Sequence, residues 1–304
     1  MISALALSPS LDVTYEVEEL SGIQRPLSVH KVAGGKALNA ARAAATLGAR
    51  VAAVAVLGGG AGHDVAAGAR ADGVDLHVVP GDPTRSCVSV FSRADGRLTE
   101  IYEHAVPVSV SAVSAALDAA VRLARSRPGW WLLSGGLPAS ASGVGEIVRR
   151  LRGAGVRVAV DTHGEPLRDA VAGGPGAAPD LVKVNRAEAG VLVGGDAPVP
   201  DLLAAVRERT GGLVVITDGA DGAWGTDGDR VLRTTLDGHT GGFPVGSGDS
   251  FLGGLLVALD RGDDLAAALA LATATGTANA QVPGAAVLDA DLARRLAGRV
   301  TVSG

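Results

Sequence analysis

Short apolar runs that end in small or polar residues recur along the chain. VAAVAVLG at 51–58 and VRVAVDT at 156–162 are two of them. A continuous apolar run of this length, bounded by turn residues, is typical of a strand buried on both faces of a parallel sheet. On this pattern, strands are predicted at 51–58, 130–136, 156–162, 180–185 and 212–219.

The segments between these runs have apolar positions at helical spacing. The clearest is SAVSAALDAAVRLARS at 111–126, and several of the others end at a glycine, which is common just after a helix. Helices are predicted at 39–48, 111–126, 143–155 and 200–211. Because strands and helices alternate, the sequence predicts an α/β protein with a mostly parallel sheet covered by helices on both faces.

Two stretches have a different pattern, in which β-forming and polar residues alternate. The first comprises 11–20 and 27–35, and the second, 85–104, has the turn residues Ala94, Asp95 and Gly96 at its middle. Alternation predicts strands with one exposed face, and the central turn predicts a hairpin. We therefore expect a small sheet, formed by about 11–35 and 84–105, that is inserted as a lid into a single domain spanning 1–304.

The composition narrows the classes of function. The chain has 304 residues, of which 47% are hydrophobic, so it is long enough to bury a substantial core. Its formal charge is −5, with 27 basic and 32 acidic residues distributed along the chain. This balance gives no electrostatic reason to expect nucleic acid or an anionic membrane as a partner. A small molecule is the expected partner.

Three further features bear on the compartment. The single cysteine, Cys87, cannot form an intramolecular disulfide, and residues 1–30 lack the pattern of a signal peptide. No uninterrupted apolar stretch has the roughly 18–20 residues of a membrane span. We expect a cytoplasmic protein.

The clearest chemistry lies in PVGSGDSFLGG at 244–254. Gly246, Ser247 and Gly248 precede an apolar helical run, and Asp249 falls in its first turn. The N-terminus of a helix exposes main-chain N–H groups, and glycines let an anion approach them closely. A carboxylate beside the anion can accept the proton of an attacking hydroxyl, so the motif favours phosphoryl transfer. The alternative is an ordinary strand-to-helix turn with a capping aspartate.

A second glycine pair begins a helix in AGGKALNAAR at 33–42. Lys36 and Asn39 lie about one turn apart there, on the same face. An ammonium and an amide in this arrangement suit a polyol or a phosphate, whereas the structural alternative is a glycine turn with a solvated lysine and asparagine. Neither glycine loop is a Walker A motif, since Gly-x-x-x-x-Gly-Lys-Ser/Thr occurs nowhere in the chain.

With these motifs, the sequence resembles the PfkB group of the ribokinase-like carbohydrate kinases, in particular its phosphofructokinase and tagatose-6-phosphate kinase branch. The resemblance runs nearly end to end. Its blocks are LSPSLDVTYEV (7–17), AGGKALNAAR (33–42), VLGGGAG (56–62), TR (84–85), GRLTEI (96–101), LLSGGLP (132–138), VDTHGEPL (160–167), LVKVNRAE (181–188), VVITDGADGA (214–223) and VGSGDSFLGG (245–254).

This resemblance implies both a fold and an activity. The fold is a ribokinase-like three-layer α/β/α sandwich with a mostly parallel central sheet and a small β-sheet lid. The activity is the ATP-dependent phosphorylation of a sugar phosphate of the fructose 1-phosphate, fructose 6-phosphate or tagatose 6-phosphate type. A homodimer is expected as well, because pairing of two lids would protect the apolar lid strands.

The resemblance also implies roles for individual residues. Asp249 matches the general base of the family, and the anion hole is matched by Gly246, Ser247 and Gly248. The positions that hold sugar hydroxyls are matched by Asp12, Gly34, Gly35 and Asn39. The basic positions that neutralise the phosphate already on the substrate are matched by Arg25, Lys36 and Arg85. Guanidinium suits this last task through its bidentate geometry.

The nucleotide site is implied in the same way. KVNRAE resembles the family's Lys-Pro-Asn-x-x-Glu, so Lys183 is expected near the nucleotide phosphates. Asn185 and Glu188 are expected to organise the Mg²⁺ of Mg-ATP, often through water. The loop along the nucleotide is matched by Thr217, Gly219 and Gly222, and the helix that flanks the adenine by 272–280. ATP and Mg²⁺ are the expected cofactors.

The sequence departs from the family pattern at several positions. Gly136 stands where the family has the second serine of Ser-Gly-Ser-Leu-Pro, Val184 replaces a proline, and Pro244 stands where a threonine is frequent. Tyr102 and His104 fall in a segment that reads Asn-Glu-x-Gly-Pro in the family. These departures leave the catalytic motif in place and affect the expected acceptor.

Other classes fit the sequence less well. The 57–64 segment lacks the third glycine of a dinucleotide fingerprint, and 218–229 lacks the oxygen ligands of an EF-hand and is expected to form a turn and hairpin. A kinase of a free sugar or a nucleoside is the alternative among enzymes. A non-catalytic sensor of a sugar phosphate or nucleotide is the alternative of another class.

Overall fold

The computed structural model describes residues 1–105, 107–137, 143–238 and 241–304. Pro138, the last residue of the LLSGGLP block, and Val106, in the segment that follows Tyr102 and His104, lie outside these ranges. A ten-stranded sheet forms the centre of the molecule, in the order β14-β13-β12-β11-β10-β9-β8-β1-β4-β5. Its strands are β1 (Ile2–Ala6), β4 (Val51–Leu57), β5 (Val74–Pro80), β8 (Trp130–Ser134), β9 (Arg157–Asp161), β10 (Leu181–Asn185), β11 (Leu213–Thr217), β12 (Ala223–Thr226), β13 (Val231–Thr235) and β14 (Thr301–Ser303).

The strands from β5 to β11 are parallel, and β12, β13 and β14 continue the sheet in antiparallel pairs. All five strands predicted from apolar runs are present, with ends that differ by a few residues. The predicted run at 212–219 ends as a strand at Thr217 and continues into a short 3₁₀ turn, η1 (Gly219–Asp221). The turn and hairpin expected at 218–229 are η1 and the β12–β13 pair, whose second strand extends to Thr235.

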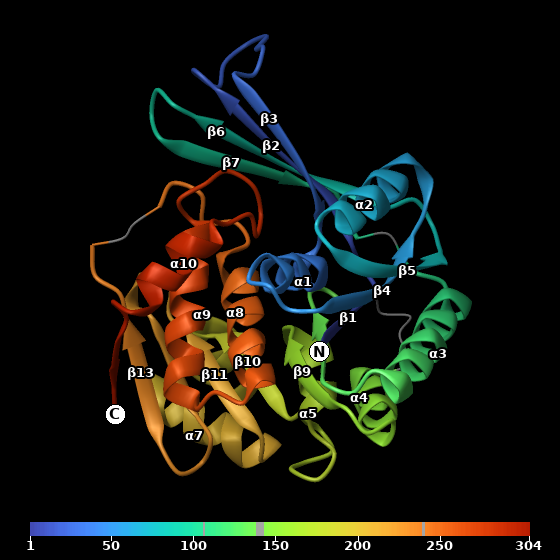
Figure 1. Ribbon diagram of the computed structural model, residues 1–304, viewed down its shortest axis with the longest axis vertical. Coiled ribbons are helices and arrows are strands. Elements are labelled where there is room, and N and C mark those ends of the chain that lie inside the picture. Colours follow the sequence, from blue (N-terminus) through green and yellow to red (C-terminus); the bar gives the residue numbers. More distant parts are fainter. Residues whose placement is uncertain (106, 138–142, 239–240) are drawn as a thin grey trace.

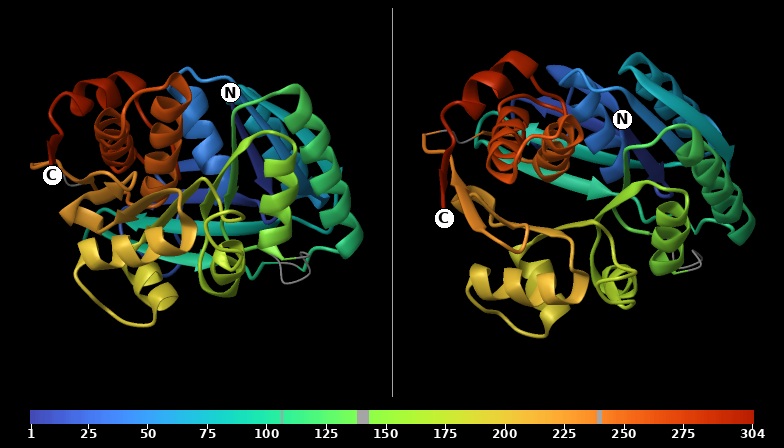
Figure 2. Two further views of the ribbon diagram at one scale, coloured as in Figure 1. Left: turned by 90° about the horizontal axis from the view of Figure 1, so that it is seen from below. Right: turned by 60° about the horizontal axis from the view of Figure 1, so that its bottom comes forward.

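Helices cover both faces of this sheet (Figures 1 and 2). Successive strand residues point to opposite faces, so Ala4 packs with one layer of helices and Leu5 with the other. The first layer contains α1 (Lys36–Thr46), α2 (Gly59–Ala71), α8 (Ser247–Arg261), α9 (Leu265–Asn279) and α10 (Ala290–Ala297). The second contains α3 (Val110–Ser126), α4 (Val144–Gly153), α5 (Gly164–Val171), α6 (Arg186–Val193) and α7 (Val199–Thr210). The three-layer α/β/α architecture predicted from the sequence is confirmed.

A separate four-stranded sheet extends from the body and forms the upper part of Figure 1. Its strands, in the order β3-β2-β6-β7, are β2 (Ser10–Val17), β3 (Ser28–Gly34), β6 (Arg85–Ser92) and β7 (Arg97–Tyr102). We call this sheet the lid sheet. It consists of the two stretches whose alternating pattern predicted half-exposed strands, and the β6–β7 hairpin turns at 93–96.

The lid sheet contacts the body through one face. Thr14 and Ser89 on this face are buried, and the ring of Phe91 lies 4.8 Å from that of Phe243, between ring centroids. Asp12 is on the same face, since it lies two residues from Thr14 on β2. The lid sheet therefore presents Asp12 toward the carboxyl edge of the central sheet.

None of the helices that the structure describes is long and apolar enough to span a lipid bilayer.

Helices α1 and α8 approach each other closely beside this edge. A Cβ atom at Gly253 of α8 would lie 2.7 Å from the carbonyl oxygen of Ala40 and 2.9 Å from the Cβ of Ala43, both on α1. Such distances are shorter than van der Waals contact, so only glycine permits this spacing of the two helices. The approach determines how far apart the first turns of α1 and α8 lie.

This close approach predicts opposite effects for two glycine-to-alanine substitutions in helices. Gly253→Ala should lower the free energy of unfolding by about 1–3 kcal/mol, because the added methyl group forces the helices apart. Gly153→Ala, in α4, is the matched control, since nothing lies within 4 Å of its Cβ position. There the entropic advantage of alanine should raise stability by about 0.5–1 kcal/mol. Urea denaturation measures both, and a stabilised Gly253→Ala variant would contradict the packing argument.

Candidate active site

The N-terminus of α8 has the geometry of an anion-binding site. Gly246 is its N-cap residue with φ 79°, and a Cβ atom there would lie 2.3 Å from the main-chain nitrogen of Ala286. Both features require glycine. Within the described ranges, the main-chain N–H groups of Gly248 and Asp249 donate no hydrogen bond to the protein. They are free to bind an anion at the positive end of the helix.

Asp249 lies in the first turn of α8 and is buried. Its Oδ2 accepts a hydrogen bond of 2.9 Å from Nδ2 of Asn39 on α1. Burial and the neighbouring Asp161 raise the pKa of Asp249 to about 7, against the opposing effects of Asn39 and of Lys36 and Lys183. The carboxylate is therefore mostly ionised, and able to accept a proton, only above about pH 7. A pKa near the working pH is the value that suits a general base.

Two lysines and Asp161 surround this carboxylate. Lys183 Nζ donates to Asp161 Oδ2 at 2.9 Å, and Lys36 Nζ lies 4.0 Å from Asp161 Oδ1. A Cβ atom at Gly248 would lie 3.2 Å from Nζ of Lys183, so this ammonium group adjoins the N-terminus of α8. Both ammonium groups thus lie near the N-terminus of α8, where they can offset the negative charge of a bound anion.

Asp161 is a site residue that the sequence analysis missed. It is the last residue of β9 and fully buried, and its Oδ1 has no hydrogen-bond partner among the described residues. Its position at the carboxyl end of a predicted strand was the available signal, because ligands bind at this edge of parallel sheets. Its charge raises the pKa of Lys36 and so keeps that ammonium group protonated.

Asp12 of β2 forms the lid side of the site. Its Oδ1 accepts a hydrogen bond of 2.6 Å from the hydroxyl of Ser10. A Cβ atom at Gly34 would lie 2.1 Å from the carboxyl carbon of Asp12, so the glycine leaves the space that this carboxylate occupies. Gly35, the N-cap of α1, has φ 91° and packs against Pro9. Burial raises the pKa of Asp12, and the hydroxyl of Ser10 and the charge of Arg42 oppose this effect.

The three predicted phosphate-binding residues are not all close together. Lys36 begins α1 beside Asp161. Arg85 begins β6 opposite Ser10, near enough to Asp12 for its charge to oppose the rise in the pKa of that carboxyl group. Arg85 donates to the carbonyl oxygen of Glu103 at 3.1 Å, and its Nε is buried without a partner among the described residues. Arg25 lies in the exposed 18–27 connection, which joins the ends of β2 and β3 that are far from Asp12. Among the residues that the structure describes, it makes no hydrogen bond or ion pair.

Asn185 and Glu188 form a capping box at the start of α6. Asn185 Oδ1 accepts from the main-chain N–H of Glu188, and Glu188 Oε2 accepts from that of Asn185, both at 2.8 Å. The second carboxylate oxygen of Glu188 remains available. No cluster of three or more histidine, cysteine or acidic ligands occurs in the described part of the chain. This donor set fits an ion such as Mg²⁺, which keeps several waters and takes few protein ligands.

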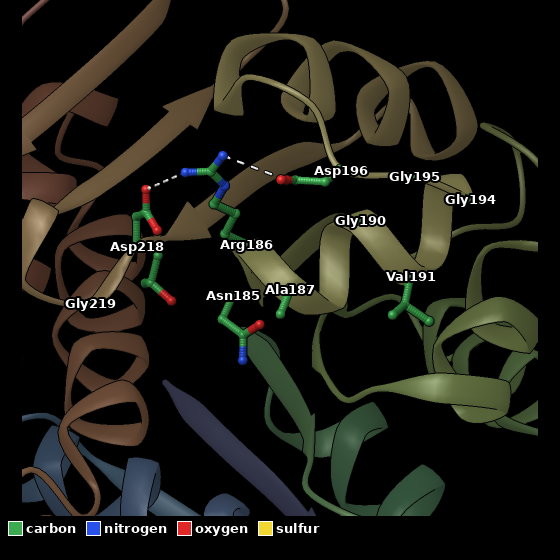
Figure 3. A pocket seen from close by; sticks show the side chains of 11 residues that line it. Asn185, Arg186, Ala187, Gly190, Val191, Gly194, Gly195, Asp196, Asp218 and Gly219 are labelled. Carbon is green, nitrogen blue, oxygen red and sulfur yellow. Dashed lines mark hydrogen bonds and ion pairs between the residues drawn. The ribbon is translucent and has the colours of Figure 1, made fainter.

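A cavity of about 800 Å³ opens at the carboxyl ends of β10 and β11. Asn185, Thr217 and Gly219 line it, and its size is typical of ligand pockets. In Figure 3, Arg186 lies between Asp196 and Asp218, with a nitrogen 3.5 Å from a carboxylate oxygen of each.

Gly222 has a structural reason to be glycine and does not line this cavity. A Cβ atom there would lie 1.8 Å from the carbonyl oxygen of Thr234, which would block the pairing of β12 with β13.

Asn279, at the end of α9, is a second residue that the sequence did not reveal. Its Nδ2 donates to the carbonyl oxygens of Phe243 and Val245, at 3.3 and 2.9 Å, and to the hydroxyl of Ser247 at 3.1 Å. The segment 272–280, expected to flank the adenine, is therefore the last part of a helix that also fixes the chain leading into α8.

Comparison with known proteins defines the class. Residues 8–291 match the pfkB family of carbohydrate kinases. The chain belongs to this family and is a phosphotransferase that acts on a hydroxyl group of a carbohydrate, with ATP as the expected phosphate donor of the family.

Individual relatives agree with this class. The chain is 32% identical over 281 residues to 1-phosphofructokinase of Xanthomonas campestris pv. campestris, a match that covers 89% of this chain and 88% of the relative. In structure it resembles Escherichia coli phosphofructokinase-2 in complex with potassium, with a TM-score of 0.88, 24% identity and 98% of each chain covered. A possible 1-phosphofructokinase of Thermotoga maritima gives 0.87 at 19% identity, with 100% of this chain and 99% of the other covered. These structural matches confirm the ribokinase-like fold.

Proposed function

We propose that this enzyme transfers the γ-phosphate of ATP to a hydroxyl group of a sugar phosphate, of the fructose 1-phosphate, fructose 6-phosphate or tagatose 6-phosphate type. The observation that carries the proposal is the position of Asp249. Its carboxylate lies in the first turn of α8, beside free N–H groups and two ammonium groups, and is held by Asn39. A base beside an anion site is the arrangement that phosphoryl transfer to a hydroxyl requires.

In the proposed reaction, Asp249 accepts the proton of the attacking sugar hydroxyl. The free N–H groups of Gly248 and Asp249, at the anion hole formed by Gly246, Ser247 and Gly248, hold the transferring phosphoryl group, and Lys183 lies beside it. The raised pKa of Asp249 makes it a stronger base than a solvated aspartate, so it takes the proton more readily as the new O–P bond forms.

ATP is proposed to lie along the carboxyl ends of β10 and β11, with Lys183, Thr217 and Gly219 near its phosphates. Asn185 and Glu188 would hold the Mg²⁺ that accompanies ATP, in part through water, and Mg²⁺ would offset the charge of the phosphates. The capping box fixes Glu188 with one oxygen bound and one available, which favours this role. Gly222 permits the pairing of β12 with β13, so its proposed contribution to the nucleotide loop is indirect.

The acceptor is proposed to bind between the lid sheet and the body. Asp12 and the Gly34–Gly35 turn would hold sugar hydroxyls, and Lys36 and Arg85 would bind the phosphate already on the substrate. Arg85 supports this assignment, because its buried Nε has no partner among the described residues and lies near Asp12. A buried, unpaired guanidinium nitrogen is unfavourable unless a ligand supplies an acceptor. The proposed place of the enzyme is the cytoplasm, where ATP is available.

We propose a homodimer formed through the lid sheets. Exposed apolar side chains gather on the lid and its β2–β3 connection: Leu20, Ile23, Leu27, Val29 and Ile101. Arg25 lies in the same connection, away from Asp12 of its own chain. Its proposed contact with a substrate phosphate is therefore a contact at the site of the other subunit. Sedimentation at micromolar concentration is expected to give twice the chain mass of 30.1 kDa, and Ile23→Asp to weaken association. A monomeric wild-type protein would contradict the dimer.

Coupled ADP release with Mg-ATP tests the proposed activity directly. The acceptors are fructose 1-phosphate, fructose 6-phosphate, tagatose 6-phosphate, free hexoses, ribose and nucleosides. We expect turnover on a phosphorylated ketose. Asp249→Asn should reduce kcat by about 10²–10⁴-fold or more, because the base is lost. Asp118→Asn is the control, since that carboxylate lies on α3 and pairs with Arg150 of α4.

The other outcomes favour the alternatives. Turnover on a free sugar or nucleoside alone would mean that Lys36 and Arg85 do not serve a substrate phosphate. Binding of ATP without turnover on any acceptor would favour a non-catalytic sensor. An Asp249→Asn variant with full activity would exclude this residue as the base.

A further inference from the structure

Arg42, in the middle of α1, is a charged residue that the proposed reaction does not use. It is 5% exposed. A guanidinium group has five N–H donors, and here it donates four hydrogen bonds and also pairs with the carboxylate of Asp72. Nε donates to the carbonyl oxygen of Ala286 at 3.3 Å. Nη1 donates to the carbonyl oxygen of Ala33 and lies 3.5 Å from Asp72 Oδ2. Nη2 donates to Asn39 Oδ1 at 2.9 Å and to the carbonyl oxygen of Ala285.

The contact with Asn39 determines which way its amide faces. Arginine has only donors, so the amide atom that faces Arg42 must be the oxygen. The amide nitrogen then faces the opposite direction, where it donates to Asp249 Oδ2 at 2.9 Å. If the amide were reversed, its oxygen would face the carboxylate, and a hydrogen bond would form only with a protonated Asp249. Arg42 therefore selects the orientation of Asn39 that favours an ionised Asp249.

The same guanidinium group also supports the anion hole and the acceptor turn. Its acceptors Ala285 and Ala286 lie directly against Gly246, the N-cap of α8. Ala286 has φ 52°, a left-handed conformation that is unfavourable for alanine and is held here by its neighbours. Ala33 precedes Gly34, beside Asp12. One buried side chain thus connects three segments that meet at the proposed reaction site.

We propose that Arg42 is a positioning residue, which orients Asn39 to donate to Asp249 and fixes the 285–286 segment against the anion hole. The assignment of Asp249 as the base rests on the proposed function, whereas the orientation of Asn39 rests on the contacts alone. Lysine cannot replace arginine here, because its three donors radiate from one nitrogen and do not reach Asn39 and the carbonyl groups together.

The other charged groups around Asp249 do not depend on Arg42. Lys36 faces it from α1, Asp161 from β9 and Lys183 from β10. Arg42 also carries its own positive charge, which acts on both Asp249 and Asp12. A test must therefore separate the orientation of Asn39 from the simple loss of a charge.

The test is a direct titration of the Asp249 carboxyl group by carbon-13 NMR of aspartate-labelled protein, with the signal identified from Asp249→Asn. Wild type, Arg42→Met, Arg42→Lys, Asn39→Ala and the double variant Asn39→Ala/Arg42→Met are compared. Arg152→Met is the matched control, because Arg152 binds the carbonyl oxygens of Gly176 and Ala178 and pairs with Asp180 at the opposite edge of the sheet. Circular dichroism and urea denaturation verify folding.

Arg42→Met is expected to move the titration midpoint of Asp249 upward by about one pH unit, the effect of losing a hydrogen bond to a charged group. Arg42→Lys should give a smaller upward shift, and Arg152→Met none. In the Asn39→Ala background, Arg42→Met should shift the midpoint much less, because the amide is absent and only the charge effect remains. If Arg42→Met does not fold, the Arg42→Lys shift and its loss in a further double variant, Asn39→Ala/Arg42→Lys, carry the test.

Two results would overturn the proposal. In the first, a folded Arg42→Met variant loses stability but keeps the Asp249 midpoint of the wild type. In the second, the shift is equally large with and without Asn39. The titration needs no sugar and no ATP, so it is independent of the activity assay. Failure of the proposed function would appear as absent turnover with the titration result unchanged.

Discussion

The carboxylate of Asp249 is buried between α1 and α8, and the amide of Asn39 keeps it from being isolated there. Removing a carboxylate from water is unfavourable, and the surroundings leave its pKa at about 7 instead of restoring the usual value. The protein thus maintains a carboxyl group that can gain or lose a proton near neutral pH. This condition depends on the spacing of the two helices, which Gly253 sets, and on the orientation of Asn39, which Arg42 sets.

Charged groups of both signs surround this carboxylate. Lys36 and Lys183 lie among Asp161, Asp249 and Glu188, so three carboxylates surround the two ammonium groups. A buried ion pair such as Lys183–Asp161 contributes little to stability, because desolvation offsets its attraction, but it fixes the ammonium group at the N-terminus of α8. The lid sheet adds Asp12 from the opposite side. In the proposed reaction the acceptor and ATP meet between these groups.

Local patterns predicted the elements of the fold, because buried parallel strands and helices have distinct periodicities. Asp249 and the glycines before it were also found from a local pattern, the glycine-rich helix start. The contact between Asn39 and Asp249 spans 210 residues, and no local pattern indicates a partner so distant. Arg42 and Asn279 were missed for the same reason, since their roles arise from segments that only the fold brings together. Asp161 did have a local signal, its position at the carboxyl end of a predicted strand. The Asn-x-x-Glu spacing of Asn185 and Glu188, in contrast, could have been recognised as a capping box from sequence.

The most direct test of the central claim is the rate of phosphoryl transfer in a single turnover, measured by rapid quench at saturating Mg-ATP and acceptor across about pH 5.5–9. For the wild type, the account predicts a rate that falls about tenfold per pH unit below pH 7, since only ionised Asp249 accepts the proton. For Asp249→Asn it predicts a much slower rate without this dependence. A wild-type rate that is constant through this range, or the same pH dependence in Asp249→Asn, would contradict the role of Asp249 as the base.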